Sequence, residues 1–280
     1  MNYTEAYLYG KNKLSEAGIA DSESDCRLLL DFACGKNMTF IFAHGEEEMP
    51  ERDEESFRKL LEKRASRYPV QLIIGKTDFM GLEFEVSEDV LIPRIDTEFL
   101  VEEAMTYVQD GASVLDLCTG SGCVLLSLMK YKNNIHGIGT DISDKALELA
   151  GRNAWNLGIG AKFIKSDMFE NIREKYDYIV SNPPYIERKV IGSLMDEVRL
   201  YEPHTALDGG EDGLDFYRII AKQAKDHLNS EGKIFLEIGY DQGDSVKKIF
   251  EDEGYINIDV VRDYVGNERV VKCSKNWKTP

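Results

Sequence analysis

Residues 114–126 read VLDLCTGSGCVLL, an apolar run, a turn that contains two glycines, and a second apolar run. The pattern predicts a buried strand, a tight turn and a helix, because glycine lets the backbone bend sharply and approach a ligand closely. A dinucleotide-binding fingerprint needs a third glycine, which would fall near Leu125 and is missing. The stretch therefore predicts a strand-to-helix junction that holds a nucleotide-like cofactor other than NAD.

Two more strand-like runs follow this junction, and each ends beside a carboxylate. Asp141 ends the first run ~20 residues beyond the glycines, the spacing at which a carboxylate holds ribose hydroxyls. After the second run, Asp167 can accept a hydrogen bond from an adenine amino group, and Met168 can pack on the ring. Asp116 is interpreted as a carboxylate near the amino group of a bound cation or as an organiser of the loop. One acidic strand end is more often a helix cap, but three in successive units indicate an S-adenosylmethionine site.

A fourth strand-like run, residues 178–181, leads directly into Asn182, Pro183, Pro184 and Tyr185. The two prolines make the segment rigid, so the Asn182 side-chain oxygen and the Pro183 carbonyl become two fixed acceptors. Two such acceptors suit an NH2 group, whose flat face Tyr185 could cover. The plain alternative is a strand followed by a Pro-Pro turn, and the cofactor pattern upstream makes that alternative less favoured.

The chain is long enough for more than one domain. Residues 1–69 repeat apolar side chains at helical spacing and predict a small helical bundle. Residues 70–92 alternate around glycines and predict a β-hairpin linker. Residues 93–280 alternate strands with helices, which predicts an α/β domain whose largely parallel sheet is covered on both faces. Within it, the long polar stretch 187–212 is expected to form one wall of the substrate cleft.

Two charged residues, Arg94 and Glu237, each allow two interpretations. Arg94 either pairs with a surface carboxylate or belongs to a segment, residues 92–98, that closes over the cofactor. Glu237 and Gly239 lie at the end of another predicted strand, where they either line the same cleft or form a structural turn.

Composition limits the classes of partner. The formal net charge of −17 disfavours nucleic acid, which normally needs a basic face to neutralise its phosphates. The five cysteines are odd in number and lack CxxC spacing, and no apolar leader or membrane-length run is present, so a soluble cytoplasmic protein with reduced thiols is expected. The four histidines form no cluster, and no metal is assigned.

With these motifs in place, the chain resembles the bacterial glutamine N5-methyltransferases that modify peptide chain release factors. The resemblance covers almost the whole length and departs from the usual family pattern at Cys118, Ile95 and Met168. It implies a class I methyltransferase fold, Rossmann-like, with a mostly parallel seven-stranded sheet behind the helical N-terminal domain. The motifs that carry it are residues 91–94 with 96–98, residues 116–122, Asp141, residues 182–185, residues 201–203 with 206–207, residues 209–214, and residues 236–239 with 242–243.

The resemblance also implies roles. The substrate is the glutamine of the Gly-Gly-Gln motif in class-1 release factors, bound by Asn182, Pro183, Pro184 and Tyr185, with the N-terminal domain gripping the protein. Asn182, Pro183 and Tyr185 are the catalytic residues, and the product of the cofactor is S-adenosylhomocysteine. An adenine-N6 or guanine-N2 methyltransferase of nucleic acid is the alternative; a monomer without nucleic-acid or membrane partners is expected. The implied cofactor residues are Asp116, Cys118, Thr119, Gly120, Ser121, Gly122, Asp141, Asp167, Met168 and Asn182.

Overall fold

A computed structural model describes residues 1–276, and the chain divides into two compact units. The N-terminal unit is Met1–Lys76 together with Met195–Tyr201, and the C-terminal unit begins at Thr77 and holds the remaining described residues. The predicted helical domain ends at residue 69, whereas this unit extends to residue 76. The unit also takes in residues 195–201, which the sequence placed in the long polar stretch of the other domain.

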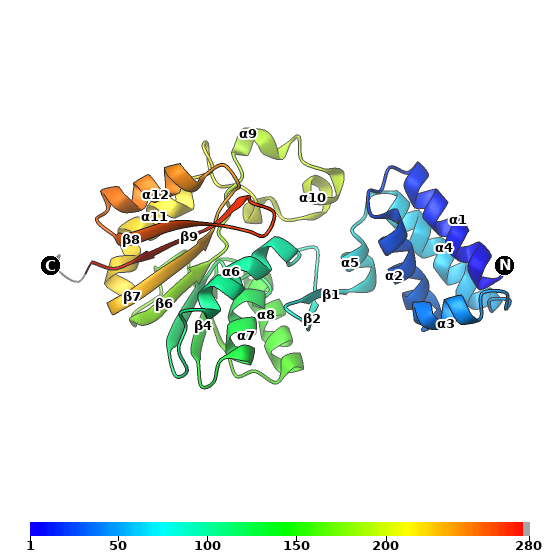
Figure 1. Ribbon diagram of the computed structural model, residues 1–280, viewed down its shortest axis with the longest axis horizontal. Helices are drawn as coiled ribbons and strands as arrows, with labels where there is room; N and C mark the ends of the chain where they lie inside the picture. The colour runs from blue at the N-terminus through cyan, green and yellow to red at the C-terminus, as the bar shows by residue number, and fades with distance from the viewer. Residues whose placement is uncertain (277–280) are drawn as a thin grey trace. The chain divides into compact units, whose positions relative to one another are not determined.

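The N-terminal unit is a helical bundle in which α1, α2 and α4 lie side by side (Figure 1). Asn2 begins α1 with a capping box, because its side chain accepts from the Glu5 backbone while Glu5 reaches back to the Asn2 amide. Helix packing is close at Gly10, where a Cβ would lie 2.7 Å from Cys26 Sγ and from Phe57. The helices are α1 (Tyr3–Glu16), α2 (Ser22–Cys34), α3 (Met38–Ala43), α4 (Glu51–Ala65), α5 (Val70–Ile74) and α10 (Asp196–Tyr201).

A buried ion pair ties this bundle together. Arg64 Nε donates to Asp25 Oδ2 at 2.6 Å, and both side chains are only 8% exposed. Arg64 Nη1 also lies 3.2 Å from Glu197 Oε1, so the same guanidinium holds α10 in the unit. Buried charges are found in pairs of this kind because an unpaired one would be costly to desolvate.

The predicted hairpin is shorter than expected. Residues 70–74 form the helix α5 instead of a strand, and the two-stranded sheet consists of β1 (Lys76–Phe79) and β2 (Leu82–Glu85). Pro69 supplies a fixed φ of −56° before α5, and Gly75 ends it in the left-handed conformation with a φ of 83°. Apolar alternation begins only after that glycine, which is why the pattern misplaced the start of the hairpin.

The C-terminal unit contains a seven-stranded sheet in the order β5-β4-β3-β6-β7-β9-β8. β9 runs antiparallel to both of its neighbours, and the other pairs are parallel. The predicted mostly parallel α/β sheet of seven strands is therefore confirmed. The strands are β3 (Ser113–Leu117), β4 (His136–Asp141), β5 (Lys162–Lys165), β6 (Tyr176–Ser181), β7 (Leu228–Glu237), β8 (Ile256–Arg262) and β9 (Glu268–Ser274).

Helices cover both faces of this sheet (Figure 1). Val114 and Val180 pack into one hydrophobic cluster with α6, α7 and α8, whereas their neighbours Leu115 and Ile179 pack into another with α11 and α12. Successive residues of a strand point to opposite faces, so a strand buried on both sides is apolar throughout. The helices are α6 (Ile95–Met105), α7 (Cys123–Tyr131), α8 (Asp144–Leu157), α11 (Asp215–Gln223) with the 3-10 turn η2 (Ala224–His227), and α12 (Gly243–Asp252).

The strand order reverses between β3 and β6, because the chain builds β3, β4 and β5 outward on one side and then returns to place β6 on the other. Open α/β sheets bind ligands outside the carboxyl ends of their strands at such a point. The long stretch after β6 contains α9 (Arg188–Ile191), α10 and the 3-10 turn η1 (His204–Ala206), where the sequence predicted only a loop. Within residues 1–276, no helix is both long and apolar enough to cross a bilayer.

Candidate active site

The glycine turn between β3 and α7 needs unusual backbone conformations. Cys118, Gly120 and Gly122 have φ values of 56°, 55° and 80°. A side chain in this region costs about 1 kcal/mol, so Cys118 carries a strain that glycine would avoid. This is the physical reason that glycine suits position 118. Gly122 then begins α7, and a Cβ there would lie 3.2 Å from the Ala150 Cβ.

Two carboxyl groups, a buried one on Asp116 and a partly buried one on Asp141, hold this turn in place. Asp116 Oδ2 accepts from Thr119 Oγ1 at 2.6 Å, and Asp116 is only 1% exposed. Asp141 Oδ2 accepts from the Gly120 amide at 3.0 Å, and its Oδ1 accepts from the Ser143 amide at 2.9 Å. Burial raises the pKa of Asp116 to about 7, and burial also raises the pKa of Asp141. The bond from Asp116 to Thr119 lies within the loop, and the role of Asp116 toward a bound cation stays a prediction.

The turn that follows β5 brings Met168 over the ends of the strands. Ser166 Oγ donates to the Met168 carbonyl at 2.8 Å, which bends the chain so that Met168 takes a φ of 47° and becomes buried. Asp167, next to it, stays exposed. The Met168 Sδ lies 3.9 Å from the Cys118 Sγ, so two of the three departures from the family pattern are in contact. Their sulfur atoms give this part of the site a polarisable apolar surface.

Asn182 is the first residue after β6. Its Nδ2 donates to Thr97 Oγ1 on α6 at 3.1 Å. Pro183 and Pro184 are buried, and the Tyr185 hydroxyl donates to Glu237 Oε1 at the end of β7 at 3.3 Å. Burial, with the adjacent Glu237 carboxylate, raises the pKa of the Tyr185 hydroxyl, so this phenol stays protonated at neutral pH.

The backbone after Tyr185 is fixed by a segment far along the chain. Gln242 Nε2 donates to the Tyr185 carbonyl at 3.0 Å. The Ile186 amide donates to the Leu207 carbonyl at 3.0 Å, and the Gly209 amide donates to the Ile186 carbonyl at 2.9 Å. A Cβ on Gly209 would lie 2.7 Å from the Tyr185 Cα, so only glycine permits this approach.

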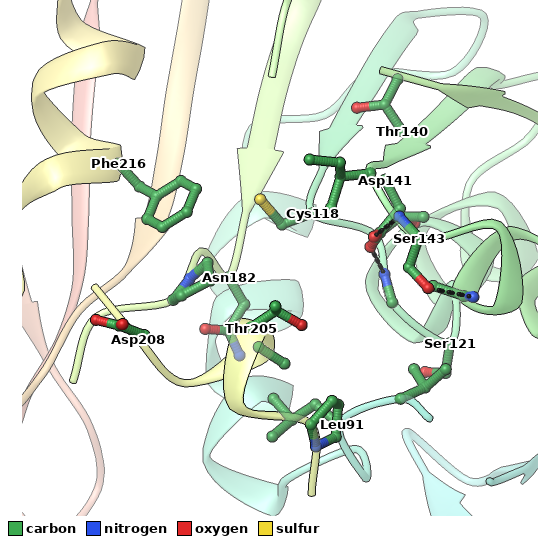
Figure 2. Close-up of a pocket in the computed structure, with 18 of the residues that line it drawn as sticks. Leu91, Cys118, Ser121, Thr140, Asp141, Ser143, Asn182, Thr205, Asp208 and Phe216 are labelled. Atoms are coloured by element: carbon green, nitrogen blue, oxygen red, sulfur yellow. Dashed lines mark hydrogen bonds between the residues drawn. The ribbon is translucent and has the colours of Figure 1, made fainter. Parts of the chain in front are cut away.

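These elements surround one cavity of about 540 Å³, a size typical of small-molecule sites. Figure 2 shows Asp141, Ser143 and Ser121 toward one end and Asn182, Phe216 and Asp208 toward the other, with Cys118 between them. The cavity lies wholly within the C-terminal unit. It therefore joins the glycine turn to the Asn-Pro-Pro-Tyr segment, as expected for a site at the reversal of strand order.

Most of the predicted site residues line this cavity. The exceptions, within the described chain, are Gly122, Pro183 and Tyr185, which are not among the lining residues. The individual roles assigned to all of these residues stay predictions. The predicted residues in the lining are Asp116, Cys118, Thr119, Gly120, Ser121, Asp141, Asp167, Met168, Asn182 and Pro184.

Several lining residues were not among the predicted site residues, although one interpretation placed residues 92–98 over the cofactor and residues 187–212 were expected to form one wall of the substrate cleft. Thr97 and the segment 89–94 come from the approach to α6, and Val90 packs on Ala146 and Leu149 of α8. Residues 203–206 come from the long connection after β6, and Phe216 comes from α11, which follows that connection. Thr97 and Pro203 belong to two of the family motifs, but nothing local in the sequence showed that both would line this cavity.

Arg94 pairs with a carboxylate, as one of its two interpretations expected, and closure of residues 92–98 over the cofactor stays a prediction. Its Nη2 donates to both Glu202 oxygens at 2.6 Å, but the Glu202 side chain is only 2% exposed and is not a surface carboxylate. Burial raises the pKa of Glu202, and Arg94 opposes that shift. Arg94 lines the cavity, and so does Pro203, the residue after Glu202. The ion pair between Arg94 and Glu202 therefore joins two walls of the cavity.

The lining suits S-adenosylmethionine. Four carboxylates, Asp89, Asp116, Asp141 and Asp167, face the cavity on the side of the glycine turn. They provide acceptors for ribose hydroxyls and amino groups and an acidic setting for a cationic ligand. Met168, Cys118 and neighbouring apolar side chains provide a surface for an adenine ring. Among residues 1–276, no group of three metal-ligating side chains is found.

The fold and the site define a class I S-adenosylmethionine-dependent methyltransferase. Residues 94–198 match the family model "Methyltransferase small domain", and residues 5–75 match "PrmC N-terminal domain". The chain is 39% identical to the release factor glutamine methyltransferase of Agrobacterium fabrum, over 93% of each chain. It is 37% identical to that of Clostridium acetobutylicum, over 97% of this chain and 98% of the relative. The chain belongs to the release factor glutamine methyltransferase family.

Solved structures support the fold of the C-terminal unit. A methyltransferase from Pyrococcus furiosus has a TM-score of 0.53 at 22% identity, covering 70% of this chain and 90% of that one. The 16S rRNA N2 G1207 methyltransferase from T. thermophilus has a TM-score of 0.52 at 16% identity, covering 72% and 50%. At these identities the likeness concerns the fold alone.

Proposed function

We propose that this protein transfers a methyl group from S-adenosylmethionine to the side-chain amide nitrogen, N5, of the glutamine in the Gly-Gly-Gln motif of class-1 peptide chain release factors. The observation that carries the proposal is the single cavity that joins the glycine turn to Asn182. Membership of the release factor glutamine methyltransferase family supports the choice of substrate, since a cavity alone identifies an acceptor class and no particular protein.

At the cofactor end of the site, different residues are proposed to bind different parts of S-adenosylmethionine. Asp141 would hold the ribose hydroxyls with the lone pairs that its bonds to Gly120 and Ser143 leave. Met168 and Asp167 would take the adenine, and the loop from Asp116 to Gly122 would bring backbone close to the rest of the molecule. When bound here, S-adenosylmethionine supplies a methyl group already activated by its sulfonium.

The acceptor end must orient a weak nucleophile, because an amide nitrogen shares its lone pair with its carbonyl. The Asn182 side-chain oxygen and the Pro183 carbonyl would accept the two N–H bonds of the substrate amide and hold the nitrogen in line. The same two acceptors stabilise positive charge as it develops on nitrogen. Correct alignment of two reactants is worth on the order of 7 to 11 kcal/mol, so positioning accounts for much of the chemistry proposed here.

The net charge supports a protein substrate. With a formal net charge of −17, the chain is proposed to act on protein without binding nucleic acid. We also propose that it acts as a monomer in the cytoplasm. The helical N-terminal unit is proposed to grip the release factor. A nucleic-acid amino-methyltransferase would share the Asn-Pro-Pro-Tyr segment, but the family assignment does not support it.

The test is transfer of labelled methyl from S-adenosylmethionine to purified release factor. A copy with the motif glutamine changed to alanine serves as the control, and duplex DNA and RNA serve as parallel acceptors. We expect label on the unmodified release factor and none on the glutamine-to-alanine copy. Label on nucleic acid alone would replace the proposal with a base methyltransferase, and equal label on both release factors would place the methyl on another residue.

A further inference from the structure

One buried asparagine on α8 is hydrogen-bonded to two segments at the cofactor end of the cavity. Asn153 is 1% exposed. Its Oδ1 accepts from the Glu85 amide at 2.8 Å, and its Nδ2 donates to the Glu85 carbonyl at 3.2 Å and to the Ser121 carbonyl at 3.0 Å. These three bonds need one acceptor and two donors on a short planar group. Asparagine is the side chain of this length that offers such a set.

The bond to Ser121 restrains a peptide group of the glycine turn. Asn153 holds the Ser121 carbonyl, and the Gly122 amide, on the same peptide group, donates to the Thr119 carbonyl at 2.8 Å. Gly120, one residue earlier, has a φ of 55° and no Cβ, so the turn has little restraint of its own. A peptide group that is bonded at both ends cannot rotate without losing both bonds. Asn153 therefore helps to fix the backbone of Ser121, which lines the cavity (Figure 2).

The bonds to Glu85 restrain the start of a second wall. Glu85 is the last residue of β2. Val90, five residues further on, lines the cavity and packs on Ala146 and Leu149 of α8. Ala146, Leu149 and Asn153 are three and four residues apart, so they share one face of the helix. The same face of α8 therefore holds both ends of the segment from Glu85 to Val90, and Asn153 joins that segment to the glycine turn.

We propose that Asn153 is a positioning residue for the cofactor, which fixes the glycine turn relative to the wall that begins at Glu85. It acts through Ser121 and Glu85, since Asn153 is not itself among the lining residues. Without Asn153, the Ser121 carbonyl and both backbone groups of Glu85 lose this partner, and the two walls are free to move relative to each other. The inference concerns the cofactor, so it does not depend on which acceptor is methylated.

The first measurement is the Kd for S-adenosylhomocysteine, determined by isothermal titration calorimetry. Asn153→Asp keeps the shape of the side chain but replaces its two donated protons by a carboxylate oxygen. Asn156→Asp makes the same change at an exposed position of α8. Asn229→Asp makes it at the edge of the sheet opposite the cavity, where Asn229 Nδ2 donates to Asp177 Oδ1 at 2.7 Å near the starts of β7 and β6.

We expect Kd to rise on the order of 10-fold to 10²-fold in Asn153→Asp, because buried backbone groups lose their partner. Asn153→Ser, which is uncharged and keeps at most one donor, is expected to raise Kd about 10-fold. Asn156→Asp is expected to keep Kd within about threefold, and so is Asn229→Asp, although Asn229→Asp loses stability. A Kd within threefold of the wild type in both Asn153 variants would overturn the inference. An equal rise in Asn229→Asp would also overturn it, because the effect would then be one of general stability.

The second measurement needs no ligand. Amide hydrogen exchange in the free protein reports how firmly each backbone group is held. In Asn153→Ser, we expect exchange at Glu85 and Gly122 to accelerate more than exchange at the core strand β6, whereas Asn229→Asp should favour β6. Unchanged exchange at both Glu85 and Gly122 would refute the positioning role. In steady-state kinetics, KM for S-adenosylmethionine should rise by the same factor as Kd, with KM for the acceptor unchanged.

Discussion

At the scale of single residues, Asn182 is the position on which the proposed chemistry depends most. It follows a buried strand and precedes two buried prolines, so its backbone has little freedom, and its side chain is held by Thr97. Its amide oxygen is one of only two acceptors proposed to orient the substrate. No neighbouring side chain can take its place, because Pro183 and Pro184 offer only backbone carbonyls.

Asn182→Ala is therefore expected to lower kcat by at least 10²-fold to 10³-fold, the usual cost of removing one preorganised hydrogen-bonding group from an active site. Kd for S-adenosylmethionine should stay largely unchanged, since the carboxylates and the glycine turn remain. Single-turnover methyl transfer and equilibrium titration of the cofactor measure the two quantities. Asn156→Ala, an exposed asparagine on α8, is the control. Undiminished turnover in Asn182→Ala would contradict the role given to the residue.

Single residues were predictable from the sequence where their partners are close in the chain. Asp116 bonds to Thr119 only three residues away, and Asp141 supports a turn through the adjacent Ser143. Thr97 gave no local signal, since the residue it contacts, Asn182, is 85 positions away. Glu237 is 52 positions from Tyr185, so its place behind the acceptor segment depended on the strand order of the whole sheet.

At the scale of elements, the segment from Gly209 to Gly213 works as a support for the acceptor segment. Gly213 has a φ of 74°, and a Cβ there would lie 2.4 Å from the Tyr185 carbonyl oxygen and 2.8 Å from Gln242 Nε2. Those two atoms are partners in the hydrogen bond that holds the chain after Tyr185. The support therefore acts through the backbone and tolerates no side chain at this position.

Gly213→Ala is expected to lower kcat at least 10-fold, because a displacement of about 1 Å in a positioning segment can cost 10²-fold in rate. The control is Gly254→Ala, which has a similar φ of 79° but open space around its Cβ. Both variants should lose about 1 kcal/mol or more of the free energy of unfolding through the backbone conformation. If both retain the kcat of the wild type, the segment does not position the acceptor site.

Elements were predicted well where their apolar pattern was long and were missed where it was short. The strands and helices from β3 to β7 follow clear runs, and their arrangement in a largely parallel sheet was expected. The five-residue helix α5 was mistaken for a strand, because so short an apolar stretch fits either structure until Pro69 and Gly75 are considered as its ends. The short helices α9 and α10 carry mixed polar sequence, and α10 is stabilised by Arg64, which lies 133 residues before Glu197.

At the scale of the whole molecule, two buried carboxyls make the stability of the protein depend on pH. Burial raises the pKa of Asp116 from 3.8 to about 7 and that of Glu237 from 4.5 to about 7. In the unfolded chain both groups lose their protons near pH 4, whereas the native protein keeps them until about pH 7. The native state therefore binds more protons between these values, and its free energy of unfolding falls as pH rises through them.

Each raised pKa corresponds to an upper bound of about 3 to 4 kcal/mol in the free energy of unfolding. The wild type is therefore expected to be less stable at pH 8 than at pH 5, and a double variant, Asp116→Asn with Glu237→Gln, should lose much less over the same interval because neither replacement ionises. Urea unfolding followed by circular dichroism at the two pH values measures the difference. Acids with lowered pKa values, such as Asp177, are already ionised at pH 5 in both proteins, so they do not disturb the comparison. Equal pH dependence in the wild type and the double variant would show that the two buried carboxyls are ionised in the native protein already at pH 5.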